Sequence, residues 1–255
     1  MGNASPVLVW AFVALALLVA GGFVIAVRRA AVATSHPDPR RLTTVTSILT
    51  ALWLALTAGL AAGGVLSFTS RPPTMAIVLL VIAAVAIGLG TSRLGERLAA
   101  GLPLAALVGA QGFRFPLELT MHRAYTEGLM PVQMSYSGRN FDILTGISAL
   151  IVAAVLAKRP KALWLARLWN VGGLILLLNI LTVAMLSAPL PFRRFLDEPA
   201  NVWITYAPWV WLPAVFVFAA IAGHIVVFRR LRQEARSRAS TDVDVHSTRS
   251  PIAVL

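Results

Sequence analysis

The sequence predicts an all-α membrane protein, a bundle of seven transmembrane helices with its N-terminus outside and its C-terminus in the cytoplasm. Composition supports this class first, because 58% of the 255 residues are hydrophobic and only 13% are charged. Soluble domains carry roughly 25% charged residues. The mean hydropathy of +0.80 agrees. The apolar residues also fall into long runs between short polar segments, and about 20 apolar residues suffice to cross a bilayer.

The runs justify each helix in turn. Residues 6–27 follow no positive segment and are followed directly by Arg28 and Arg29, which indicates a span and not a signal peptide. The second run contains Gly59 and Gly63, a spacing that permits close helix approach. The approximate predicted spans are residues 6–27, 42–68, 74–90, 98–126, 140–157, 163–186 and 208–228.

Lysine and arginine indicate the orientation, because cytoplasmic loops are enriched in them. With the N-terminus outside, the inner segments contain Arg28, Arg29, Arg40, Arg41, Arg93, Arg97, Lys158, Arg159 and Lys161, besides the arginines of the tail. The outer loops contain only Arg71, Arg123, Arg139, Arg193 and Arg194. This orientation also predicts an aromatic belt at the outer interface, formed by Trp203, Tyr206, Trp209 and Trp211.

From Arg229 onward the chain is polar and basic, with too little apolar content to fold alone. We therefore expect a membrane domain at 1–228 and a disordered cytoplasmic tail at 229–255, whose first arginines rest on anionic head groups. The formal charge of +12 lies mostly in short loops and this tail, so topology explains it and no nucleic-acid partner is expected. The chain has no cysteine, which excludes disulfides and cysteine metal sites.

A polar stripe interrupts the fourth predicted span. Gln111, Arg114, Glu118 and His122 follow one another at spacings of three and four, which place side chains on one helix face. An ionised side chain near the bilayer centre costs about 2.5–3.5 kcal/mol on insertion scales, so such groups usually mark a site. We expect Arg114 near mid-membrane to pair with Glu118, beside a kink at Pro116.

Four further residues complete the predicted site. Arg139, Asn140 and Asp142 follow a loop, 127–139, that we expect to fold onto the membrane surface as a lid. Asn140 and Asp142 also suit the cap and first turn of the fifth helix, so capping remains an alternative role. Asn179 on the sixth helix is a candidate, although amides in membrane helices often only join helices. The candidate ligand- or proton-binding residues are Arg114, Glu118, His122, Arg139, Asn140, Asp142 and Asn179.

Three classes of function remain open. The intramembrane charges favour a carrier or ligand-binding protein, in which Arg114 holds an anionic group and Glu118 exchanges a proton. An intramembrane acid–base enzyme would use Glu118 or Asp142 as base, His122 as acid and Arg139 as oxyanion partner. A structural subunit would use the cluster for helix packing alone.

The sequence has no nucleophile motif, phosphate-binding loop or three-ligand metal spacing, so we expect no metal and no cofactor. Helix rise from residue 208 places His224 near the inner face, too far from His122 to share a metal or haem. Lys158 and Lys161 lie in an inner turn, which excludes a retinal Schiff base. The expected partners are the lipid bilayer and a small-molecule or lipid ligand.

Several motifs together resemble a known group of proteins. They are FRFPLE, which presents Arg114, Pro116 and Glu118 as Arg-x-Pro-x-Glu, GRNFD after a Pro-x-x-Met step, LWNVGGL, LSAPLPF, EPAN, WLP and His224. Over residues 76–231 the chain resembles a group of small bacterial multi-helix membrane proteins usually described as uncharacterised. The resemblance implies this fold and a bacterial plasma (inner) membrane, and it implies no activity.

Overall fold

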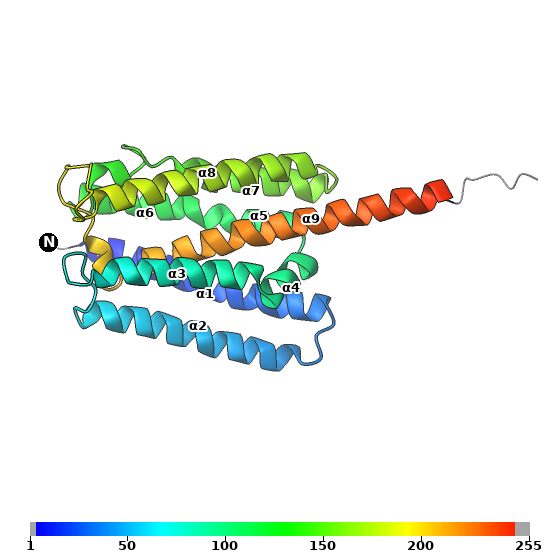
Figure 1. The fold of residues 1–255 in the computed structure, drawn as a ribbon, viewed down its shortest axis with the longest axis horizontal. Helices are drawn as coiled ribbons and strands as arrows, with labels where there is room; N and C mark the ends of the chain where they lie inside the picture. Colours follow the sequence, from blue (N-terminus) through cyan, green and yellow to red (C-terminus); the bar gives the residue numbers. More distant parts are fainter. Residues whose placement is uncertain (1–3, 248–255) are drawn as a thin grey trace, which may run out of the picture.

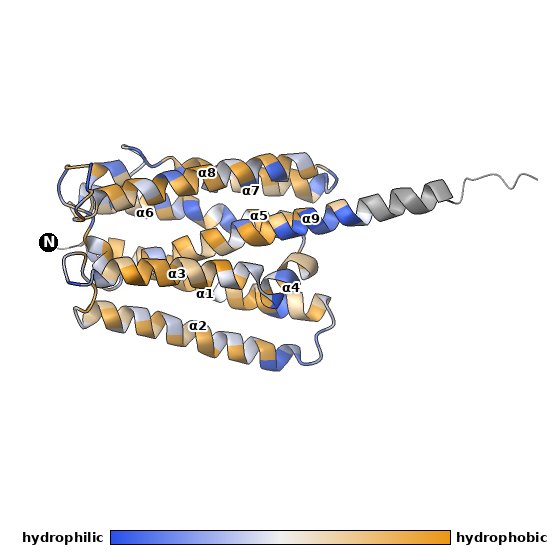
Figure 2. Ribbon diagram, viewed as in Figure 1, coloured by the Kyte–Doolittle hydropathy of each residue, from blue (hydrophilic) through white to orange (hydrophobic). Residues whose placement is uncertain are grey.

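The computed structural model describes residues 4–247, with side chains described up to residue 237, and every regular element in this range is helical. The helices lie side by side in one bundle, and the last helix extends beyond it (Figure 1). They are hydrophobic along most of their lengths (Figure 2). Five helices are long and apolar enough to cross a membrane, or six if one bent pair counts as a span. The all-α prediction is confirmed, and the helices mark the chain as a membrane protein.

The first helices begin where the sequence supplies caps. Ser5 Oγ accepts a hydrogen bond from the backbone of Leu8, and Asp38 Oδ1 accepts one from the backbone of Arg41 at 2.8 Å. A proline occupies the first turn after each cap, where its missing N–H is not needed. These two helices are α1 (Pro6–Ala33) and α2 (Pro39–Ala62). The next helix, α3 (Thr74–Thr91), has no side-chain cap.

The predicted close approach at Gly59 and Gly63 is not made within the described chain. A Cβ at Gly59 would meet nothing within 4 Å, and one at Gly63 would meet only atoms of the same segment. Both glycines are exposed.

The fourth predicted span is broken, so its expected start at residue 98 is wrong. The chain bends by 115° between the helix that ends at Gly101 and the segment that begins at Leu104. Pro103 explains the bend, because it lacks a backbone donor and restricts Leu102 to extended backbone. The pieces are α4 (Arg93–Gly101), α5 (Leu104–Gly109), the 3-10 turn η1 (Ala110–Phe113) and α6 (Arg114–Thr126).

The remaining helices follow the predicted spans closely, except that the last begins later. A π-helical turn replaces its first part, and Pro213 lies within that turn. Trp53 Nε1 from α2 donates to Ala214 O at 2.8 Å, which satisfies a carbonyl of the irregular turn. The elements are α7 (Asp142–Lys158), α8 (Leu163–Ser187), the π turn η4 (Leu212–Val217) and α9 (Phe218–Ser247).

The predicted aromatic belt is wrong for two of its members. Trp203 and Trp209 are buried, with 1% and 5% of their surface exposed. The ring of Phe12 from α1 packs edge-on against Trp209 and against Phe216, at centroid distances of 4.9 and 5.3 Å. These rings lie inside the bundle because the segment before η4 folds back over its end, and Tyr206 remains exposed.

The basic residues after 228 are part of α9, which continues through residues 229–247 where the sequence indicates a disordered tail. Arg229 Nη1 donates to Gly90 O at 3.1 Å and to Ser92 O at 2.9 Å, and Arg230 Nη1 donates to the last carbonyls of α4. These guanidinium groups bond carbonyls near the C-terminal ends of α3 and α4, where a positive charge is favoured. The end of the expected tail lies outside the described residues.

Candidate functional site

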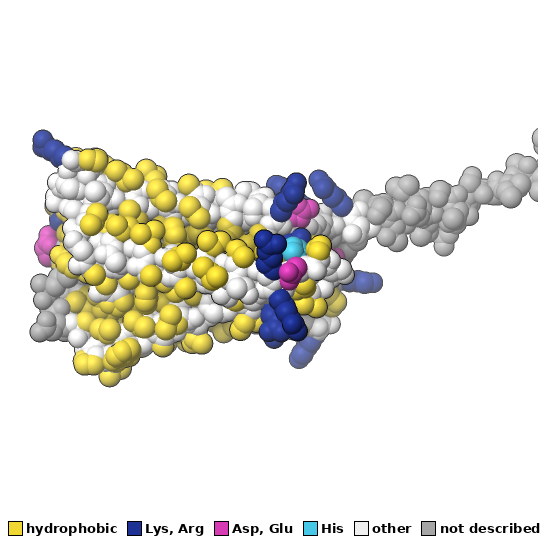
Figure 3. Space-filling view, turned by 90° about the horizontal axis from the view of Figure 1, so that it is seen from below, with side chains coloured by type: hydrophobic (Ala, Val, Ile, Leu, Met, Phe, Trp, Pro, Cys, Tyr) yellow, Lys and Arg dark blue, Asp and Glu magenta, His cyan; other side chains and the backbone are white. Residues whose placement is uncertain are grey.

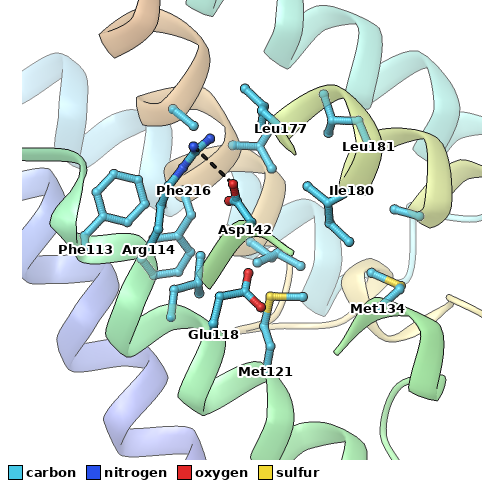
Figure 4. A pocket seen from close by; sticks show the side chains of 15 residues that line it. Phe113, Arg114, Glu118, Met121, Met134, Asp142, Leu177, Ile180, Leu181 and Phe216 are labelled. Atoms are coloured by element: carbon cyan, nitrogen blue, oxygen red, sulfur yellow. Dashed lines mark ion pairs between the residues drawn. The ribbon is translucent and has the colours of Figure 1, made fainter. Parts of the chain in front are cut away.

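Arg114 and Asp142 are the first residues of α6 and α7, and their side chains meet between the two helices (Figure 4). Arg114 Nη1 lies 3.2 Å from Asp142 Oδ1, and the two side chains are 1% and 7% exposed. The helices approach closely because Gly146 has no side chain, since a Cβ there would collide with the backbone nitrogen of Phe115. The expected pair of Arg114 with Glu118 is corrected: in the described structure the ion pair of Arg114 runs across helices to Asp142.

Glu118 is held by Asn140. The Asn140 Nδ2 group donates to Glu118 Oε2 at 2.7 Å and to Met134 O at 2.9 Å. Its Oδ1 accepts from the backbone N–H of Asp142, the first residue of α7, at 3.0 Å, although the N-cap of this helix is Phe141 and not Asn140 as the capping alternative predicts. Asn140 therefore connects Glu118 to the start of α7, and both side chains are buried.

His224 joins this cluster from α9, through a contact that the sequence does not predict. Its Nε2 lies 3.3 Å from Arg114 Nη1, and its Nδ1 lies 2.8 Å from Asn170 Oδ1. Asn170 Nδ2 donates to the carbonyl of His224, which leaves the amide oxygen as the acceptor for Nδ1–H. The imidazole is therefore neutral with its proton on Nδ1, and Nε2 accepts from Arg114.

The predicted depth of His224, near the inner face, stays a prediction. Its neighbour Ile225 packs against Gly90, close to the C-terminal end of α3. The 3.3 Å contact with Arg114 puts the two side chains at one level of the bundle.

Two glycines make room for the polar groups. A Cβ at Gly173 would lie 2.8 Å from His224 Cε1, and a Cβ at Gly223 would collide with the amide of Gln111. Gln111 Nε2 donates to Ala219 O at 3.3 Å, so α9 holds this member of the stripe too. In the sequence, a glycine three residues after Asn170 and another directly before His224 could have indicated that polar side chains pack closely here.

His122 lies outside the cluster, although it shares the stripe. Its Nδ1 is 2.9 Å from Ser135 Oγ, and its ring stacks on Tyr136 at a centroid distance of 4.3 Å. Within the described residues no hydrogen bond joins it to Glu118 or Asp142. His122, the general acid of the enzyme hypothesis, therefore contacts Ser135 and Tyr136 and not the carboxyl groups.

Arg139 and Asn179 are also outside the cluster and attach the preceding loop to the bundle. The Arg139 guanidinium lies 5.0 Å from the ring centroid of Phe195, and its carbonyl accepts from Asn179 Nδ2 at 2.8 Å. A guanidinium over an aromatic face is stabilised there. Arg139 makes no described hydrogen bond to the carboxyl groups, so the geometry does not support it as an oxyanion partner.

The loop 127–139 is part of the core and not a surface lid. Leu129, Met130 and Met134 are at most 3% exposed. Gln133 Nε2 donates to Ser187 Oγ at 3.0 Å at the end of α8. The apolar side chains explain the difference, because they gain more by packing into the bundle than by covering it.

A cavity of about 60 Å³ adjoins the cluster. Arg114, Glu118 and Asp142 form its polar side, and Met134 from the loop also lines it. The opposite wall is apolar and comes largely from α8 (Figure 4). One water-sized group needs roughly 10–15 Å³, so the cavity accommodates a few non-hydrogen atoms.

The model of one protein family, described as Domain of unknown function (DUF8737), matches residues 72–232. Comparisons with curated proteins and with solved structures found no match. The matched region runs from the start of α3 into α9 and includes every residue of the buried cluster. This agrees with the resemblance to an uncharacterised family over residues 76–231. Because the match covers more than half of the chain, the protein belongs to the DUF8737 family.

Proposed function

We propose that this chain is a multi-pass membrane protein that binds a small ligand together with a proton, as a proton-coupled carrier does. One observation carries the proposal: two carboxyl groups and a single guanidinium are buried around one cavity. With both carboxyl groups ionised and His224 neutral, Glu118 and Asp142 together exceed Arg114 by one negative charge. An uncompensated buried charge costs several kcal/mol. An exchangeable proton at the cluster removes this charge.

The topology that suits this function has seven spans with the N-terminus outside. α7 has 17 residues, which is within the range that crosses a bilayer, and it lies beside α8 (Figure 1). Lysine and arginine side chains gather at the end of the bundle from which α9 extends (Figure 3). Cytoplasmic ends are enriched in these residues. We assign this end to the cytoplasm, and the resemblance favours the plasma membrane of a bacterium.

The cavity then belongs to the outer half of the membrane. Met134 lines it from the loop after α6, and Leu212 lines it from the first turn of η4. Ser5 Oγ donates to Glu127 Oε1 at 2.6 Å, which ties the end of α6 to the start of α1. With the N-terminus outside, these segments are on the outer side and the ligand reaches the cluster from there.

Infrared difference spectroscopy on the full-length protein in lipid nanodiscs tests the proton site. Between acidic and alkaline pH, the wild type should lose the carbonyl band of a protonated buried carboxyl group. Glu118→Gln or Asp142→Asn should remove or shift this band. The matched variants Glu198→Gln and Asp197→Asn lie in an exposed loop and should leave it unchanged.

A spectrum without such a band, or the same band in both buried-site variants, contradicts the proposal. The cluster would then serve helix packing, as in a structural subunit. Circular dichroism and gel filtration of each variant separate this result from loss of folding.

A further inference from the structure

We propose that the cavity binds a short monocarboxylic acid, held through its carboxyl group by Arg114 and Glu118. This inference rests on the proposed proton-coupled function and names the class of its ligand. It is carried by an unpartnered guanidinium nitrogen, a second carboxyl group that lines the same cavity, and an apolar wall opposite them.

The free donor belongs to Arg114. Its Nη1 faces Asp142 and His224, at 3.2 and 3.3 Å. Its Nη2 is buried and has no hydrogen-bond partner among the described residues, although the side chain lines the cavity and is only 1% exposed. A buried N–H group without an acceptor is costly, and a carboxyl oxygen is the acceptor that a guanidinium binds most strongly.

Glu118 supplies the second contact. Its Oε2 accepts from Asn140, and the side chain lines the cavity together with Arg114. In the bound state Glu118 is protonated, the carbonyl oxygen of the ligand accepts from Arg114, and the hydroxyl of the ligand donates to the carbonyl oxygen of the Glu118 carboxyl group. The cluster then has no net charge. The same state forms when a carboxylate and one proton from solution bind to the cluster with Glu118 already protonated. Binding transfers this one proton and forms or breaks no other covalent bond.

The charged surroundings agree with uptake of an acid as a neutral unit. Glu118 has Arg114 on its own helix, Asp142 on α7 and the neutral His224 on α9, while α8 contributes no ionisable side chain to the cavity. A carboxylate without its proton would add a further negative charge beside two carboxyl groups. Binding therefore requires the proton.

The remaining lining selects a short apolar body. Leu177, Leu181 and Ala184 of α8 form the wall opposite the charges, and Phe216 of η4 lines the cavity beside Arg114 (Figure 4). The volume of about 60 Å³ is several times what one water needs, so the cavity has room for a short acid such as acetate. A halide would leave this wall without contacts, and a dicarboxylate would place its second charge against leucine.

Equilibrium dialysis of radiolabelled acetate against the full-length protein in nanodiscs tests the inference. We expect saturable binding whose apparent affinity falls about tenfold per pH unit above the pKa of free acetic acid while Glu118 is protonated, because one proton enters with each acetate, and more steeply once Glu118 has lost its own proton. Ala184→Phe fills the cavity without changing a charge and should weaken binding at least about tenfold, since the site is then occupied. Leu178→Phe is the matched control, because Leu178 lies on the same helix with 56% of its surface exposed, and it should bind like the wild type.

Three outcomes overturn the inference: no saturable acetate binding, equal binding by the Ala184→Phe and Leu178→Phe variants, or displacement of acetate by chloride at equal concentration. The infrared band of Glu118 is measured without ligand. If that band is present and acetate does not bind, the ligand class is wrong and the proton site stands. If both are absent, the proposed function fails as well.

Discussion

The guanidinium of Arg114 is bonded to Asp142 across helices, 3.2 Å away, while Glu118 on the same helix accepts from Asn140 at 2.7 Å. Each ionisable residue of the Arg-x-Pro-x-Glu motif is thus paired with a residue of the GRNFD motif. The loop between the motifs packs into the core, which holds the two ends in register. The two motifs are therefore one structural unit, and the predictions below test what it depends on.

Asp142→Ala should destabilise the protein by about 3–5 kcal/mol, because it leaves the Arg114 guanidinium buried without its counter-ion. Urea unfolding in detergent micelles, followed by tryptophan fluorescence, measures the change in the free energy of unfolding. Asp197→Ala removes an exposed carboxyl group from a loop and should change this free energy little. Equal effects of the two substitutions would show that the buried pair contributes no stability.

His224 should be neutral at neutral pH, with its proton on Nδ1. The reason is the order of donors, in which Arg114 donates to Nε2 and Nδ1–H donates to the Asn170 carbonyl oxygen. Nitrogen NMR on protein labelled at histidine, with His224→Gln to assign the signal, distinguishes the two tautomers and the imidazolium. A signal from the imidazolium or from the Nε2–H tautomer would contradict this arrangement.

Gly146→Ala should destabilise the protein by at least about 1–3 kcal/mol, the usual cost of inserting a group into a packed interface. The added Cβ collides with the backbone of α6 at Phe115, which cannot move away as a side chain can. Gly172→Ala is the matched control, since nothing lies within 4 Å of its Cβ position. Thermal unfolding of both variants should separate them, and similar midpoints would indicate that α6 and α7 are not closely packed.

The contact between α1 and α6 should weaken in acid. Hydrogen bonds from the side chain and backbone of Ser5, together with Arg123, lower the pKa of Glu127 from its ordinary value of 4.5. Because the folded-state pKa is the lower one, the stabilisation is complete above about pH 4.5 and is lost as the pH falls through the folded-state pKa.

The unfolding midpoint of Glu127→Gln should therefore be below that of the wild type above about pH 4.5, and the difference should shrink in more acidic buffer. Asp197→Asn, in the exposed loop after α8, is the control. A difference that stays constant over this pH range would show that the Glu127 carboxylate does not hold the N-terminus.

Much of the architecture followed from the sequence alone. Long apolar runs must form helices in a bilayer, because every backbone polar group there needs an internal partner, so the helical class and most helix bounds could be predicted. Arg114, Glu118, Asn140 and Asp142 could be named as one site because charged groups are rare among apolar residues. The resemblance to an uncharacterised membrane protein family also rested on sequence motifs.

Only the tertiary structure decided how these residues are paired. Helical spacing favours contacts along α6. Instead, Arg114 forms an ion pair with Asp142, and Glu118 accepts a hydrogen bond from Asn140. These contacts form because Gly146 lets α7 approach the backbone of α6. His224 on α9 joins the cluster through Arg114 and Asn170, and a rise counted along one helix cannot show which residues of other helices it meets. Which partner a buried charge finds depends on how closely helices pack, and that distance is set by side chains far apart in the chain.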